Sequence, residues 1–115
     1  MNKHFDRIIV SAEDRFLDFW PTVSTAWQLH FGIKPTLALV THSELSDEVV
    51  QKLTQFGDVM LFKAVPFVPI QNQAKLVRFI AASYFPYEVC TIEDIDTIPL
   101  QSQFVNDRLR LVKVS

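Results

Sequence analysis

The sequence predicts an α/β fold, a three-layer, doubly wound and mostly parallel sheet with the element order β-α-β-α-β-α-β. Short apolar segments alternate along the chain with longer segments whose apolar residues recur every three or four positions. The short segments are apolar on both faces, as in parallel strands that helices cover on both sides. The length of 115 residues, with 49% hydrophobic and 21% charged residues, suits one globular domain. We therefore expect residues 1–115 to form a single domain.

Four segments are expected to be strands because they are short, apolar and bounded by Gly, Pro or acidic residues. They are residues 8–10, 36–41, 58–62 and 87–92. The first is followed by Ser11-Ala12-Glu13-Asp14, and the last by Glu93-Asp94-Ile95-Asp96. Beyond them, a short helix is expected near 101–106 and a further strand at 109–114.

Three helices are expected between these strands, at about 16–31, 46–56 and 73–84. Pro21 lies inside the first, so this helix either begins near Pro21 or bends there. Gly32 follows it, at a position where glycine typically ends a helix. Ser43 and Ser46 are both candidate N-caps of the second helix.

The tryptophans and the cysteine are expected in the core. Trp20 and Trp27 fall on the apolar stripe of the first helix, together with Phe16 and Phe19, and Cys90 falls within the fourth strand. The three histidines show no spacing typical of metal ligands, and of them His42 alone follows a predicted strand.

Composition excludes several classes of function. Eleven Lys and Arg residues against 13 Asp and Glu residues give a net charge of −2, so we expect no nucleic-acid partner. No apolar run approaches the roughly 18 residues of a membrane span. One cysteine cannot form an internal disulfide, and without a targeting segment we expect a cytoplasmic protein. Neither of the Gly-rich phosphate loops, G-x-G-x-x-G and G-x-x-x-x-G-K, can be written with the two glycines of this sequence.

The Asp-x-Asp pair after the fourth strand is the strongest functional signal. Ligands of open parallel sheets bind at the carboxyl ends of the strands. In an extended segment Asp94 and Asp96 point to the same side, with Cα atoms about 6.5 Å apart, and Glu93 points to the other. Their charges repel unless a cation lies between them, and Mg²⁺ or Mn²⁺ suits carboxylate oxygens. The alternative is an acidic turn that caps the next segment.

Two further segments could contact an anionic or polar ligand. Lys75 and Arg78 share one face of the third helix, whose N-terminus itself favours anions; the alternative is a solvated basic face. Ser11 or Asp14 could bind a ligand hydroxyl or a base edge, or could instead cap the helix that follows.

Three motifs resemble those of a known family. They are "D-I-D-x-[IV]-P-[LM]" at 94–100, "Q-A-[KQ]-x-[IV]-R" at 73–78 and "A-W" at 26–27. Together with the order of elements, they resemble the nucleotide-sugar-binding half of the glycosyltransferase A-type fold, a nucleotide-diphospho-sugar transferase-like architecture. The motifs extend over most of the chain.

The resemblance implies a role for each matching residue. Asp96, with Asp94, would bind the Mn²⁺ or Mg²⁺ ion that bridges the diphosphate of a nucleotide-sugar donor, and Asp94 would also contact the ribose or a metal-bound water. Lys75 and Arg78 would approach the diphosphate or the sugar. Ser11, Ala12 and Glu13 would edge the base pocket. The metal would act as a Lewis acid on the departing diphosphate.

The sequence departs from the family after the Asp-x-Asp pair. Enzymes of this fold need a second half there, often with a catalytic carboxylate and a further metal ligand, whereas residues 97–115 contain Asp107 but no His or Glu. We therefore expect this chain to be incomplete for catalysis, a fragment or a degenerate relative. The alternative is a non-catalytic α/β binding module or one that self-assembles into a homo-oligomer. A phosphatase of the haloacid dehalogenase type fits poorly, because its Asp-x-Asp motif opens the fold.

Overall fold

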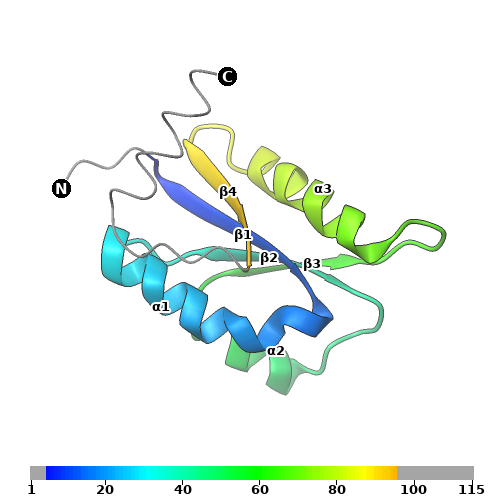
Figure 1. Ribbon diagram of the computed structural model, residues 1–115. Helices are drawn as coiled ribbons and strands as arrows, with labels where there is room; N and C mark the ends of the chain where they lie inside the picture. Colours follow the sequence, from blue (N-terminus) through cyan, green and yellow to red (C-terminus); the bar gives the residue numbers. More distant parts are fainter. Residues whose placement is uncertain (1–4, 96–115) are drawn as a thin grey trace.

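The computed structural model describes residues 5–95, except for the side chain of Asp94, and bears out the predicted α/β class. The elements are β1 (Arg7–Glu13), the 3₁₀ helix η1 (Asp14–Phe19), α1 (Trp20–Phe31), β2 (Thr36–Thr41), α2 (Asp47–Thr54), β3 (Val59–Lys63), α3 (Ile70–Ser83) and β4 (Cys90–Asp94) (Figure 1). The helix predicted near 101–106 and the strand predicted at 109–114 lie outside the described residues.

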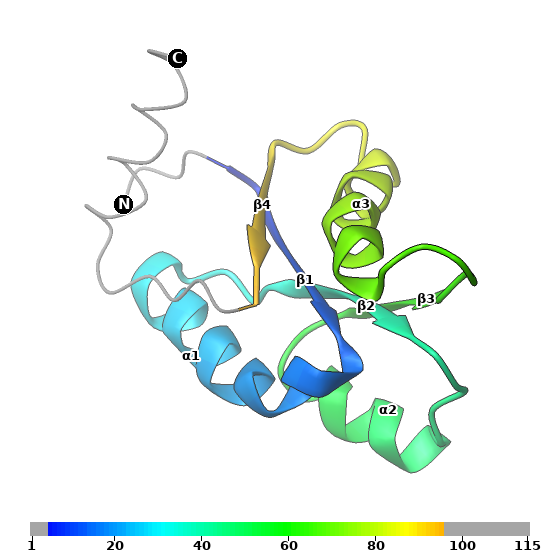
Figure 2. The same ribbon diagram turned by 45° about the vertical axis from the view of Figure 1, so that its right-hand side comes forward.

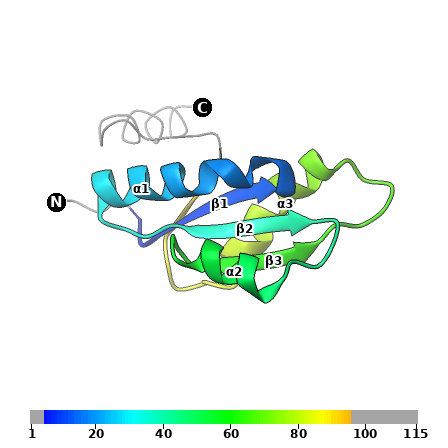
Figure 3. The ribbon, with the colours of Figure 1, turned by 90° about the horizontal axis from the view of Figure 1, so that it is seen from below.

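The four strands form one parallel sheet in the order β3-β2-β1-β4. Figure 3 shows β1, β2 and β3 running in the same direction. The chain adds β2 and β3 on one side of β1 and then crosses back to add β4 on the other side. This reversal places the carboxyl ends of β1 and β4 at the position where open α/β sheets bind ligands.

Helices cover both faces of the sheet. Figure 2 shows α1 and α2 on one side and α3 on the other. Alternate residues of β1 serve the two sides, because Ile8 and Val10 pack in the core beneath α1, whereas Ile9 packs against α3. The two-sided burial explains why the strand segments are apolar throughout.

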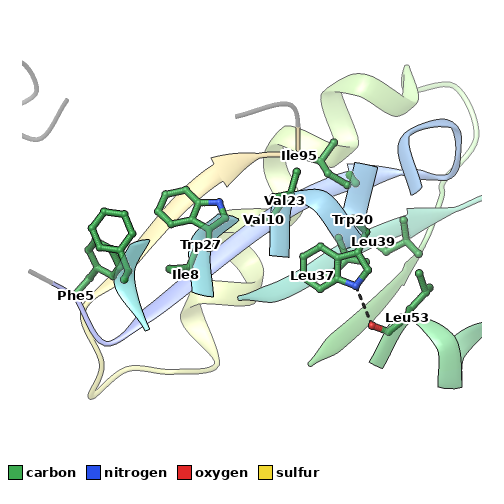
Figure 4. Close-up of a cluster of buried hydrophobic side chains, with 12 residues drawn as sticks. Phe5, Ile8, Val10, Trp20, Val23, Trp27, Leu37, Leu39, Leu53 and Ile95 are labelled. Carbon is green, nitrogen blue, oxygen red and sulfur yellow. Dashed lines mark hydrogen bonds between the residues drawn. The ribbon is translucent and has the colours of Figure 1, made fainter. Parts of the chain in front are cut away.

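The core beneath α1 is built around two tryptophans, as predicted (Figure 4). Trp20 and Trp27 are fully buried. The indole N–H of Trp20 donates to the carbonyl oxygen of Leu53 at 2.9 Å, which joins α1 to the last turn of α2. Cys90 differs from the prediction: it is half-buried, because β4 is an edge strand of the described sheet.

The first helix begins later than its apolar pattern suggests. Residues 14–19 form η1, and α1 starts at Trp20 with Pro21 in its first turn, so the helix begins near Pro21 and does not bend there. Gly32, with φ of 65°, ends α1 in the left-handed conformation. Because 3₁₀ geometry turns its side chains by a different angle, Phe16 and Phe19 leave the buried stripe and are partly exposed.

Two other boundaries differ from the prediction. Ser46, and not Ser43, caps α2, since its hydroxyl accepts from the backbone N–H of Val49 at 3.3 Å. The third helix begins at Ile70, directly after Pro69, and so precedes the predicted start at Gln73 by one turn. The buried amide of Gln73 bonds the backbone of Val65 and Val68 and fixes the loop before α3.

Candidate functional site

A cavity of about 220 Å³ lies at the carboxyl end of β1, beside the first turns of α3. It is called the β1 pocket below. Its lining residues come from both sheet and helices: Ser11, Ala12, Glu13, Phe16, Gln71, Ala74, Lys75 and Ile95. Four of the residues predicted from sequence therefore line one cavity, namely Ser11, Ala12, Glu13 and Lys75. The cavity stands where the strand order reverses between β1 and β4.

Ser11 and Glu13 lie within β1, whereas the sequence placed them in a loop after a shorter strand. As alternate strand residues they share the α3 side of the sheet with Ile9. Each is only 2% exposed. Ser11 Oγ and Glu13 Oε2 have no hydrogen-bond partner within the part of the chain that the structure describes. Buried polar atoms are normally bonded, and leaving one unsatisfied costs about 1–3 kcal/mol. A ligand that donates to these atoms would remove that cost.

Arg15 is the partner of the other Glu13 oxygen. Its Nε donates to Glu13 Oε1, and its own side chain is mostly exposed. This hydrogen bond, and then the charge of the Glu13 carboxylate, raises the pKa of the Arg15 guanidinium. The cation thus binds Oε1 and leaves Oε2 without a partner among the described residues.

Neither Ser11 nor Asp14 caps the helix that follows β1. The residue at the N-cap of η1 is Glu13, and no side chain accepts a capping hydrogen bond there or at the N-cap of α1. The capping interpretation of this segment is therefore wrong. Asp14 is half-buried and does not line the β1 pocket.

The third helix brings Lys75 to the pocket but not Arg78. Lys75 is exposed at the rim, together with Gln71, while Ala74 is buried between them. Arg78 lies further along α3, half-buried, with its guanidinium carbon 5.5 Å from the centre of the Phe79 ring. Lys75 and Arg78 were expected to contact the same ligand, but only Lys75 lines the β1 pocket.

The Asp-x-Asp segment starts at the edge of the β1 pocket. The register of β4 pairs the Cα of Asp94 with that of Ser11, and Ile95 lines the cavity. Glu93 is buried, and its Cα pairs with that of Val10, whose side chain lies in the core beneath α1. Glu93 therefore points to the other side of the sheet from Ser11, as predicted. Asp96 and the side chain of Asp94 lie outside what is described. Within residues 5–95, apart from that side chain, no three His, Cys, Asp or Glu side chains are grouped to hold a metal.

The end of β2 carries a second cavity of about 380 Å³, lined by Thr41, Ser43, Glu44, Leu45, Leu61, Phe62 and Lys63. His42 is exposed and lines neither cavity. Thr41 is the one lining residue there that is buried. This cavity therefore lacks the buried, unpartnered oxygens that mark the β1 pocket.

Four lining residues of the β1 pocket were not predicted as binding residues: Phe16, Gln71, Ala74 and Ile95, the last of which lies between the predicted Asp94 and Asp96. Phe16 was expected in the core, and its exposure follows from the 3₁₀ geometry of η1. Gln71 and Ala74 belong to the first turns of α3, which starts one turn early. Pro69 was the available signal, because a proline commonly stands at a helix start.

No protein-family model and no curated protein matches this chain. The candidate site is therefore defined by the pocket and by the residues that line it. Among the described residues, no helix is long and apolar enough to cross a membrane.

Proposed function

We propose that the β1 pocket binds the nucleotide part of a nucleotide sugar, and that the chain corresponds to the donor-binding half of a glycosyltransferase A-type fold. The observation that carries the proposal is the pair of unpartnered, buried oxygens, Ser11 Oγ and Glu13 Oε2, in a cavity where the strand order reverses. The position of α1 and α2 opposite α3 supports the doubly wound, transferase-like assignment.

The inner part of the pocket suits a base or a ribose. A carboxylate oxygen accepts hydrogen bonds, and a serine hydroxyl accepts or donates them. Phe16 adds a partly exposed aromatic ring to the same cavity. Nucleobases are commonly held by stacking on an aromatic ring together with hydrogen bonds to their edges. These groups therefore favour the uncharged end of a nucleotide.

The rim of the pocket suits the diphosphate. Lys75 brings a positive charge, and the N-terminal end of the 14-residue helix α3 favours an anion through its backbone dipoles. We propose that Asp94 and Asp96 hold Mn²⁺ or Mg²⁺ there, because β4 delivers Asp94 beside Ser11. When bound, the metal would neutralise the diphosphate and polarise its bond to the sugar.

Donor binding is the activity that these residues support. The groups that activate an acceptor are expected after Asp96, as the resemblance implies. The decisive experiment is calorimetric titration of the chain with UDP and with GDP, each with and without Mn²⁺. The proposal predicts binding of at least one nucleotide that strengthens with Mn²⁺. It is wrong if neither nucleotide binds when Mn²⁺ is present.

A non-catalytic module that assembles with itself is the second candidate. One observation favours it: Leu76, Phe79 and Ile80 of α3 are each about half exposed. Such a patch is typical of protein contacts. Sedimentation at rising protein concentration separates the candidates, because self-assembly predicts a growing mass and no metal-dependent nucleotide binding.

A further inference from the structure

A buried carboxylate faces the β1 pocket and restricts the hydrogen-bond pattern of any base that fills it. Glu13 is 2% exposed, and its Oε2 has no partner among the described residues. Arg15, a permanent cation, donates to Oε1. The group that meets Glu13 must therefore present N–H or O–H donors, since a carboxylate beside a cation acts as an acceptor.

We infer that the pocket selects guanine among the four common bases, an inference that rests on the proposed function. A carboxylate binds best to two donors that lie side by side, as it does with the fork of a guanidinium. Each oxygen has two lone pairs, so Oε1 can accept from Arg15 and from a ligand at once. Guanine presents N1–H and the 2-amino group next to each other on its Watson–Crick edge, and so provides this fork.

The other bases present a mismatched pattern to Glu13. Uracil has one N–H between two carbonyl oxygens, which repel a carboxylate. Adenine and cytosine each have one amino group beside a ring nitrogen whose lone pair would face the second oxygen. A site built around a hydrogen bond strongly rejects the analogue that lacks the donor, because a buried polar atom is then left unpaired.

Two residues that line the pocket suit a flat ligand. Phe16, 37% exposed, lines the same cavity as Glu13, and the small side chain of Ala74 limits how far α3 fills the space. A base on the Phe16 ring gains stacking energy in addition to its hydrogen bonds.

The test compares GDP, IDP and UDP by calorimetry on the whole chain in the presence of Mn²⁺. IDP differs from GDP only in lacking the 2-amino group. Loss of one hydrogen bond to a charged group predicts binding of IDP about tenfold to a hundredfold weaker than GDP, and UDP should be weaker than GDP. Glu13→Gln, which replaces one acceptor by a donor, should reduce the difference between GDP and IDP to less than about threefold. Glu44→Gln, the same change on an exposed residue at the end of β2, should keep the difference.

The outcomes separate this inference from the function on which it rests. If nucleotides bind but UDP binds as tightly as GDP, or IDP as tightly as GDP, guanine selection is wrong and the proposed function stands. If no nucleotide binds, the proposed function fails, and the inference fails with it. The comparison of GDP with IDP on the unmodified chain requires no variant, so it decides the question even if Glu13→Gln does not fold.

Discussion

The backbone amide of Ile95 donates to the carbonyl oxygen of Ser11, with an N···O distance of 3.1 Å. This hydrogen bond holds the end of β4 against the strand that carries the two unpartnered oxygens of the β1 pocket. Ile95 comes directly after Asp94, whose Cα pairs with that of Ser11 in the sheet. The segment predicted to bind a metal and the segment predicted to edge a base therefore meet at one position in the sheet.

The first prediction compares two buried serines. Ser24 is buried, donates to the carbonyl oxygen of Phe56 and accepts from Gln28 Nε2 at 2.9 Å, whereas Ser11 Oγ has no described partner. Ser24→Ala should therefore lower the free energy of unfolding by about 1–3 kcal/mol. Ser11→Ala should lower it by less than about 0.5 kcal/mol, since no hydrogen bond is lost. Urea unfolding of both variants without nucleotide measures this, and equal losses would show that Ser11 is bonded in the unliganded protein.

The second prediction concerns the charge at the rim. Lys75→Ala should weaken nucleotide binding by roughly threefold to tenfold at low ionic strength, and by less at high salt, because an exposed charge is screened. Lys52→Ala is the matched control, since Lys52 is exposed on α2, where its Nζ lies 3.6 Å from Glu48. Titrations at two salt concentrations give the comparison. If the two variants behave alike, Lys75 has no role in binding.

The third prediction concerns the amino end of the sheet, far along β1 from the pocket. Arg7 Nη1 donates to Thr36 Oγ1 at 2.9 Å, Arg7 Nη2 donates to Glu88 at 3.3 Å, and the guanidinium lies 3.7 Å from the centre of the Phe85 ring. Arg7→Lys keeps the charge but loses this planar fork and stacking. It should lower the free energy of unfolding by about 1–2 kcal/mol in urea, with nucleotide affinity unchanged. A change in affinity instead would contradict a purely structural role.

The fourth prediction is a pH dependence. Burial raises the pKa of the Cys90 thiol above its ordinary value of 9.0, and the carboxylate of Glu88 raises it further, while Arg7 lowers it. The folded state therefore keeps its proton at a pH where the unfolded state has lost it, so stability is retained below about pH 9.0 and falls as the pH rises above it. Cys90→Ala should show a smaller decline between about pH 8 and about pH 10 (roughly one unit on each side of the thiol's ordinary pKa). Parallel declines in the two proteins would show that the thiol is not responsible.

The sequence predicted the strands and much of the pocket because these depend on local pattern. Apolar segments closed by acidic or small residues located β1 and β4, and the carboxyl end of β1 then identified Ser11 and Glu13. Pro21 and Gly32 marked the limits of α1 through their own backbone preferences.

The remaining differences depend on contacts that no local pattern records. The change from 3₁₀ to α geometry at Trp20 turned Phe16 from the expected core toward the pocket. Gln73 was read as part of a ligand-facing helix start, but its amide bonds the backbone at Val65 and Val68, in a loop where Phe67 adopts a φ of 70°. The conformation of this loop therefore depends on its contact with the side chain of Gln73. The metal prediction at Asp94 and Asp96 stays a prediction.

The most direct test of the account is a map of backbone amide chemical shifts as GDP and Mg²⁺ are added to the ¹⁵N-labelled chain. If the β1 pocket is the nucleotide site, the largest changes will fall on residues 11–16 and 71–75, which line it or directly adjoin its lining. Largest changes at residues 41–45 and 61–63, around the second cavity, would contradict the central claim, and so would a spectrum that does not change.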